Sequence, residues 1–180
     1  MAYQAALNDQ GPRPRSTRSS RIRGVILSAA AGAILSISGP ALAQDAAQVE
    51  EGLAVWKRGG CTTCHGTFAQ GGEGGDAPEG PSLRKTKLER GDLVETIACG
   101  RPGSQMPFNL AGAYTEVSCW GMAVGEVADG TKSGRSLTAE EIEAMVEYLM
   151  ARVVGKGKIT LEECALYFGD PANFGCQSYQ

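Results

Sequence analysis

Histidine and paired ligand motifs are scarce in this 180-residue chain. His65 is the only histidine, and Cys61 and Cys64 form the only C-x-x-C pair. A structural zinc site takes four Cys or His ligands at short spacing, so these absences argue against the common zinc sites. A thioredoxin-like redox centre requires a βαβ pattern around its C-x-x-C motif, whereas both flanks of this motif have helical patterns. A plain disulfide is the remaining alternative for the pair.

Positive charge is scarce after the first forty or so residues. The chain has 17 Lys and Arg against 20 Asp and Glu, but five arginines and Asp9 lie within residues 1–43. The rest has 12 basic against 19 acidic residues, a net charge of about −7. Nucleic acid and anionic membrane surfaces are therefore poor partners. A protein with a basic patch suits this chain better, because complementary charge speeds encounter.

The first 43 residues are predicted to be a cleaved signal peptide. A basic region ending at Arg23 precedes the apolar stretch 25–37, and residues 41–43 read Ala-Leu-Ala, an A-x-A cleavage signal. An uncleaved membrane anchor is the alternative, but the stretch is short for a span and is interrupted by serines. No Arg-Arg pair is present, so Sec-type export to the periplasm is expected. The mature chain would be residues 44–180.

Cys61-Thr62-Thr63-Cys64-His65 is a C-x-x-C-H motif, which is typical of covalent c-type haem attachment. Both thiols add across the haem vinyl groups, and the adjoining imidazole binds the iron. One motif predicts one haem c. Because no second histidine exists, a bis-histidine haem is excluded. The opposite axial position is left to methionine, water or a weaker donor.

Four further cysteines are expected to form disulfides in an exported chain: Cys99, Cys119, Cys164 and Cys176. Four cysteines allow three connectivities, and the sequence does not choose among them. Proximity along the chain suggests pairing the first with the second and the third with the fourth. Each such bridge would contribute about 3 kcal/mol by the chain-entropy argument.

Helical periodicity predicts helices at 46–58, at 90–97, and from a capping box at Thr138 to near Gly155. A further short helix is expected at 161–167. Gly52 lies on the same face of the first helix as Trp56. Glycine lowers helix stability, so we expect another helix to approach the backbone closely there.

The remaining segments are predicted to be irregular, with no strand. Residues 66–80 are expected to be a solvated loop, although Glu73, Asp76 and Glu79 make a calcium site conceivable. Residues 109–136 have many turn-forming positions and little periodicity, which indicates a long surface excursion.

In chain order, these features resemble the monohaem class I c-type cytochrome family. The matching pieces are Gly52 with Trp56, residues 61–66, Gly80-Pro81-Ser82-Leu83, Met106-Pro107, and the helix 137–150 with Tyr148. The resemblance implies an all-α class I cytochrome c fold of few helices around one haem. It covers about 46–108 and 137–154. The expected organisation is a cytochrome domain at 44–155 with an insertion at 109–136, followed by a C-terminal extension at 156–180.

The resemblance also assigns roles at the site. His65 would bind iron through Nε2, and the carbonyl of Pro81 would accept the Nδ1 proton. Met106 would be the sixth ligand, with Met122 as its competitor. Two other methionines, Met145 and Met150, lie in the apolar stripe of the last long helix and are expected in the core.

A six-coordinate haem predicts a one-electron carrier, not an enzyme. The insertion and tail are loosely like those of cytochromes that serve periplasmic dehydrogenases, such as quinoprotein alcohol dehydrogenases. A dehydrogenase would then be the donor, and a terminal oxidase or another cytochrome the acceptor. One alternative is a subunit of a stable complex, which an apolar patch around Trp120, Phe168 and Phe174 would favour. Another is a haem enzyme or gas-binding protein with an open iron site.

Overall fold

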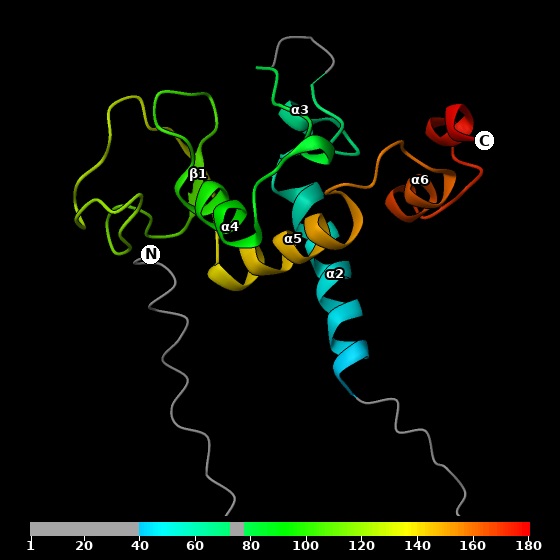
Figure 1. The fold of residues 1–180 in the computed structure, drawn as a ribbon, viewed down its shortest axis with the longest axis horizontal. Helices are drawn as coiled ribbons and strands as arrows, with labels where there is room; N and C mark the ends of the chain where they lie inside the picture. Colours follow the sequence, from blue (N-terminus) through cyan, green and yellow to red (C-terminus); the bar gives the residue numbers. More distant parts are fainter. Residues whose placement is uncertain (1–39, 73–77) are drawn as a thin grey trace, which may run out of the picture.

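Two long helices that cross each other form the centre of the fold. The computed structural model describes residues 40–72 and 78–180. Helix α2 (Pro40–Arg58) packs against α5 (Ala139–Arg152) (Figure 1). Helix α2 begins six residues before the helix predicted at 46, because a proline is tolerated in the first turn of a helix. The predicted signal peptide lies outside the described residues up to position 39, so its cleavage stays a prediction.

The contact between α2 and α5 is closest at Gly52. A Cβ atom there would lie 2.0 Å from the carbonyl oxygen of Ala144 and 2.7 Å from Cβ of Tyr148. The expected close approach of another helix is therefore confirmed. Buried side chains of both helices surround this contact and form much of the core: Leu53, Val55, Trp56, Ile142, Met145, Val146 and Leu149.

Helix α4 (Arg90–Cys99) packs against α5 and starts with a capping box of Glu89 and Asp92. Its apolar face, with Leu93, Val94 and Ile97, is buried. The capping box predicted at Thr138 starts α5, with Glu141 as its second residue. Met150 was expected in the core, but the side chain is 36% exposed. Its position is at the edge of the apolar stripe, so this expectation was wrong.

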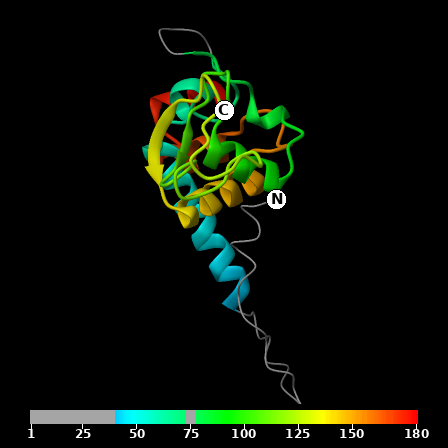
Figure 2. The same ribbon diagram turned by 90° about the vertical axis from the view of Figure 1, so that its left-hand side faces the viewer.

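A two-stranded parallel sheet departs from the expected all-α fold. Strand β1 (Phe108–Leu110) pairs with β2 (Ser133–Leu137), with Leu110 opposite Leu137 (Figure 2). The prediction of an all-α fold is therefore confirmed only in part: the core is helical, but the absence of strands was wrong. Neither strand has a recognisable sequence signal, because β1 has three residues, and four of the five β2 residues are exposed and do not alternate.

Between the strands, the predicted excursion runs away from the helices and is tied back by the Cys99–Cys119 disulfide. The Cys164–Cys176 disulfide lies in the tail, where it joins α6 (Leu161–Phe168) to the 3-10 helix η2 (Phe174–Tyr179). Both pairings follow the proximity suggested by the sequence.

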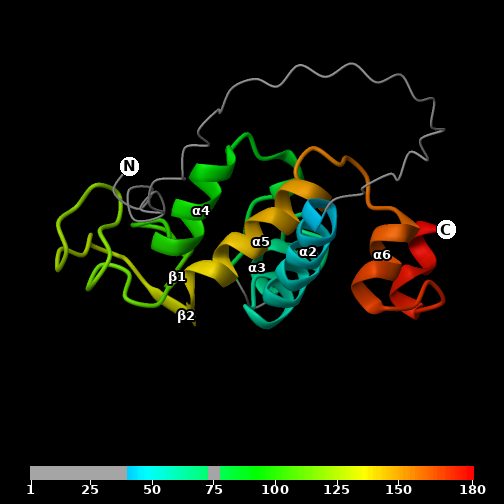
Figure 3. The same cartoon turned by 90° about the horizontal axis from the view of Figure 1, so that it is seen from below.

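The α6–η2 unit and the excursion lie at opposite ends of the structure (Figures 1 and 3). Trp120 is 40% exposed in the excursion, whereas Phe168 and Phe174 are 40% and 84% exposed in the α6–η2 unit. The three side chains therefore do not make one apolar patch. None of the helices in the described part of the chain is both long and apolar enough to cross a membrane.

Two of the three acidic residues named for a conceivable calcium site, Glu73 and Asp76, lie outside the described residues. Within residues 40–72 and 78–180, no group of three or more His, Cys, Asp and Glu side chains is arranged to hold a metal ion. Glu79 follows the gap and is exposed.

Candidate functional site

The C-x-x-C-H motif folds into a single helical turn, α3 (Thr62–His65), directly after α2. The chain reverses at Gly60, whose φ of +75° lies in the left-handed region that favours glycine. The His65 amide then donates to the carbonyl of Cys61 at 3.0 Å. Because Cys61 and Cys64 are three residues apart in this turn, they share one side of it. Both are free thiols and partly buried.

Cys61 lies against the core helix α5. Its Sγ is 3.7 Å from Sδ of Met145, which is only 1% exposed. The prediction that Met145 is a core residue is therefore confirmed. Burial is the main cause that raises the pKa of the Cys61 thiol to about 11, so this thiol is protonated at neutral pH. The motif thus packs against the core that α2 and α5 form.

The imidazole of His65 is buried and oriented by one hydrogen bond. Its Nδ1 lies 2.9 Å from the carbonyl oxygen of Pro81. A carbonyl oxygen only accepts, so Nδ1 is the donor, and in the neutral tautomer Nε2 has the lone pair. The structure therefore brings His65 and Pro81 together as the resemblance implied. The role of His65 as a metal ligand stays a prediction.

Backbone hydrogen bonds hold the Pro81 segment beside α3. The Gly80 amide donates to the Cys64 carbonyl at 2.8 Å, and the Gly71 amide donates to the His65 carbonyl at 2.8 Å. A Cβ on Gly80 would lie only 2.8 Å from Nδ1 of His65. Only glycine allows this approach, which puts the next carbonyl, that of Pro81, in reach of the ring.

Met106 lies in a tight loop between α4 and β1, on a different element from His65. The Met106 carbonyl accepts from the Arg101 amide at 3.0 Å, and its amide donates to Oγ of Ser104 at 3.1 Å. The side chain is partly buried against the main core, as is that of Met122. Across the described residues, no hydrogen bond links Met106 to His65. The choice of Met106 over Met122 as a ligand therefore stays a prediction.

Asn109 organises the Met106 loop, a role that the sequence did not indicate. Its buried amide nitrogen donates to the carbonyls of Ile97 at 3.2 Å and Pro107 at 3.1 Å, and its Oδ1 accepts from the Arg135 amide at 3.0 Å. One side chain therefore joins α4, the methionine loop and β2. Only Phe108 separates Asn109 from Met106-Pro107, and no sequence pattern marks this role.

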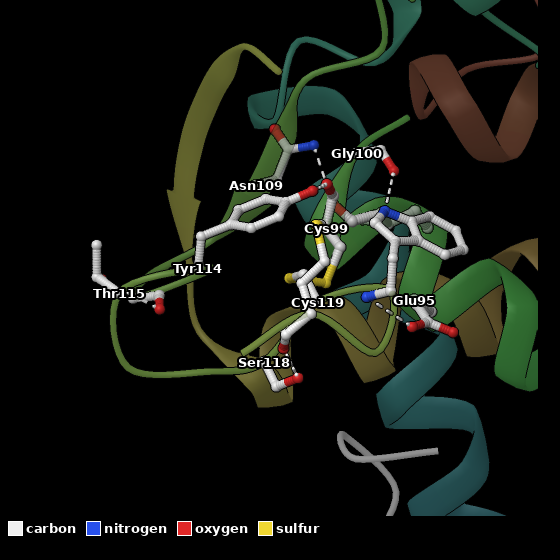
Figure 4. Close-up of a disulfide and its surroundings, with 12 residues drawn as sticks. Glu95, Cys99, Gly100, Asn109, Tyr114, Thr115, Ser118 and Cys119 are labelled. Carbon is white, nitrogen blue, oxygen red and sulfur yellow. Dashed lines mark hydrogen bonds between the residues drawn. A yellow bond between two sulfur atoms is a disulfide. The ribbon is translucent and has the colours of Figure 1, made fainter. Parts of the chain in front are cut away.

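The Cys99–Cys119 disulfide joins the end of α4 to the excursion between the strands (Figure 4). Tyr114 lies beside it, and its hydroxyl donates to the Cys99 carbonyl at 2.8 Å. Tyr114 is 1% exposed and has a φ of +66°, a strained value for a non-glycine residue. The Trp120 indole nitrogen donates to the Gly100 carbonyl at 3.2 Å. The insertion thus braces the residues that precede Met106.

The donor set of this site fits a c-type haem. Two free thiols and one imidazole with its Nδ1 already bonded lie within five consecutive residues. Cys61 and Cys64 would hold the haem covalently, and Nε2 of His65 would bind its iron. A side chain at position 80 would crowd the ring, because a Cβ there would lie 2.9 Å from Cε1 of His65.

A comparison with known families agrees with this geometry. The family model described as cytochrome c oxidase, cbb3-type, subunit III matches residues 47–124. This match is to a c-type cytochrome domain and includes α2 from residue 47 on, the C-x-x-C-H motif, α4 and the Met106 loop. No curated protein and no solved structure matches the chain.

Proposed function

Because this chain belongs to the monohaem class I c-type cytochromes, whose haem-based chemistry is electron transfer, we propose that it is a periplasmic one-electron carrier and not an enzyme. Cys61 and Cys64 would hold one haem covalently, and His65 and Met106 would bind its iron. The observation that carries the proposal is the buried His65 imidazole, held at Nδ1 by the Pro81 carbonyl, beside two free thiols.

The haem, when bound, supplies a one-electron iron couple. The residues of the chain fix its ligands and tune that couple. The hydrogen bond from His65 to Pro81 makes the imidazole a stronger donor, which favours the oxidised iron. The thioether of Met106 is a soft, neutral ligand that raises the potential. A carrier of this kind requires no acid–base pair at the site.

The proposed partners are redox proteins with basic docking surfaces. The mature chain has a net charge of about −7 if cleavage follows Ala43, and complementary charge accelerates encounter. A periplasmic dehydrogenase, such as a quinoprotein alcohol dehydrogenase, is the proposed donor. A terminal oxidase or another cytochrome is the proposed acceptor.

A second candidate is an electron-transfer subunit that remains in a stable complex. The description of the matching family model names a subunit of an oxidase, which favours this candidate. Exposed apolar side chains are compatible with it, with Phe174 at 84% exposure. Purification from native periplasm separates the two: a carrier elutes alone at its monomer mass, whereas a subunit elutes with constant partners.

The absorption spectrum of the purified holoprotein tests the site. We expect a sulfur-to-iron charge-transfer band in the oxidised form and no carbon monoxide adduct in the reduced form. The Met106→Ala variant should lose the band and bind carbon monoxide, and the Met122→Ala control should retain the wild-type spectrum. The reverse result for the two variants would move the ligand to Met122. A wild type that readily binds carbon monoxide would refute the carrier and favour an enzyme or a gas-binding protein.

A further inference from the structure

The C-terminal extension contacts two segments near His65. One follows His65 in the chain, and the other follows Pro81, whose carbonyl oxygen is hydrogen-bonded to the imidazole. We propose that the disulfide-closed lobe of residues 156–180 is a brace for the histidine side of the site, with Arg84 and Phe68 as positioning residues. This inference rests on the proposed role of His65 as the iron ligand. Its experiment is chosen so that the two can fail separately.

Arg84 is the first connection between the lobe and the site. Its side chain is 7% exposed, although it carries a charge. The guanidinium donates to the carbonyls of Gly157 at 2.7 Å and Lys158 at 3.2 Å, and to both oxygens of Glu163 at 3.0 and 3.1 Å. Gly157 and Lys158 lie in the segment that leads into α6, and Glu163 lies in α6 itself. Arg84 therefore holds three points of the lobe at once.

Arg84 also lies three residues after the Pro81 carbonyl that orients His65. Its backbone is part of the 3-10 helix η1 (Leu83–Lys85), whose Leu83 amide donates to the Ala69 carbonyl at 2.9 Å. The Gly155 amide donates to the Arg84 carbonyl at 3.1 Å. A displacement of Arg84 would thus be transmitted along a short, hydrogen-bonded segment to Pro81.

Phe68 is the second connection, three residues after His65. Its ring is 6% exposed and is enclosed by aromatic rings of the lobe. The ring centroids of Tyr167 and Tyr179 lie 5.5 Å away, and that of Phe168 lies 6.2 Å away, all in edge-to-face arrangements. Phe68 and the two half-cystines of the Cys164–Cys176 bridge form the buried centre of the lobe.

The core of the lobe is therefore completed by a residue of the haem-motif segment. The Arg84 guanidinium adds a link between these two connections, because it also donates to the Phe68 carbonyl at 3.4 Å. Lys57 at the end of α2 caps the lobe as well, with its ammonium 4.6 Å from the Tyr167 ring centroid. The chain after His65 and the chain after Pro81 are thus clamped by one covalently closed unit.

The test compares reduction potentials of haem-loaded variants with unchanged net charge. The double variant Arg84→Gln/Glu163→Gln removes the clamp and one charge of each sign. The double variant Cys164→Ser/Cys176→Ser opens the lobe without touching any charge. The matched control is Arg90→Gln/Glu147→Gln, which removes the ion pairs of Arg90 with Glu147, at 2.7 Å, and with Glu143 between α4 and α5, away from the lobe.

If the lobe positions His65, the midpoint reduction potential of the haem should be higher in both lobe variants than in wild type and in the control. Loosening Pro81 weakens the hydrogen bond that makes His65 a strong donor, and this destabilises the oxidised iron. The His65 ring Nδ1 proton should also exchange faster with solvent by NMR. A purely structural role would lower the unfolding midpoint and leave both readouts unchanged, which would overturn the proposal.

Amide hydrogen exchange separates this proposal from the function it rests on. The Gly80 and Leu83 amides should exchange faster in both lobe variants than in the control, whether or not Met106 binds iron. If wild type lacks a His/Met haem but these amides respond, the carrier proposal fails and the brace stands. If the amides and the potential stay at wild-type values in a haem-loaded lobe variant, the brace fails. Should the Arg84 variant not fold, the cysteine pair decides.

Discussion

Replacing Gly52 with alanine tests whether the contact between α2 and α5 sets the position of the site. Two effects of opposite sign compete. Alanine is favoured over glycine inside a helix by about 1 kcal/mol. Against this, the new Cβ would lie 2.0 Å from the Ala144 carbonyl oxygen, and backbone atoms cannot rotate away from it as a side chain can. Helices α2 and α5 must therefore separate by about 1.3 Å to reach even the shortest carbon–oxygen contacts, of about 3.3 Å, seen in proteins.

The steric effect should win. Overpacking in a well-packed core costs about 1–3 kcal/mol, and a backbone clash belongs at the upper end of that range. The net loss is then about 2 kcal/mol. For a folded part the size of residues 44–180, the midpoint of thermal unfolding should fall by about 7 °C. Cys61 should move relative to Met145 as well, since α2 leads directly into the motif.

Thermal unfolding of the holoprotein, followed by far-ultraviolet circular dichroism, measures this change. The control is Ala54→Gly, at an exposed position of the same helix, which should cost only the helix propensity of about 1 kcal/mol. Gly52→Ala should therefore unfold at a lower temperature than Ala54→Gly. If Gly52→Ala instead melts at or above the wild-type temperature, propensity dominates and the reasoning about the helix contact is refuted.

Three further results are expected. Cys99→Ser/Cys119→Ser opens a bridge with a sequence separation of 20 residues. The variant should lose about 3 kcal/mol of unfolding free energy in denaturant, and its sulfur-to-iron charge-transfer band should be weaker. An unaltered spectrum would count against the idea that this disulfide stiffens the Met106 loop. Asn109→Ala removes three hydrogen bonds and should cost about 3 kcal/mol, an expectation that an unchanged denaturation midpoint would contradict. Burial is the main cause that raises the pKa of Tyr148 to about 12, compared with about 10 in the unfolded chain. The free energy of unfolding should therefore fall as the pH rises from about 10 to about 12. Tyr148→Phe should lose this dependence when unfolding is measured against pH.

Local sequence patterns were enough for the helices and the haem motif. The capping box at Thr138 and the apolar spacing of α4 act within one or two turns, so the sequence contains the whole signal. Gly52 also predicted a close contact between helices. Glycine lowers the stability of a helix, and a close approach of another backbone is a reason to keep it there. Burial was less predictable at the edge of a stripe, as the exposed Met150 shows.

The sheet and the positioning residues depended on contacts between distant parts of the chain. Strand β1 pairs with a segment more than 20 residues later, and neither strand has an alternating pattern. Arg84 would ordinarily be expected at the surface. It is buried only because the tail supplies two carbonyls and a carboxylate around it.

The sequence by itself determined the chemistry of this protein: two thiols and one imidazole in five residues, a net negative charge after residue 43 and four further cysteines. These features follow from residue identity and short spacing, which do not depend on the rest of the fold. Only the tertiary structure decided which carbonyl orients His65, which cysteines pair, and that the tail packs on both segments around the histidine. Those contacts depend on where distant segments meet, and the packing of α2 on α5 fixes that arrangement.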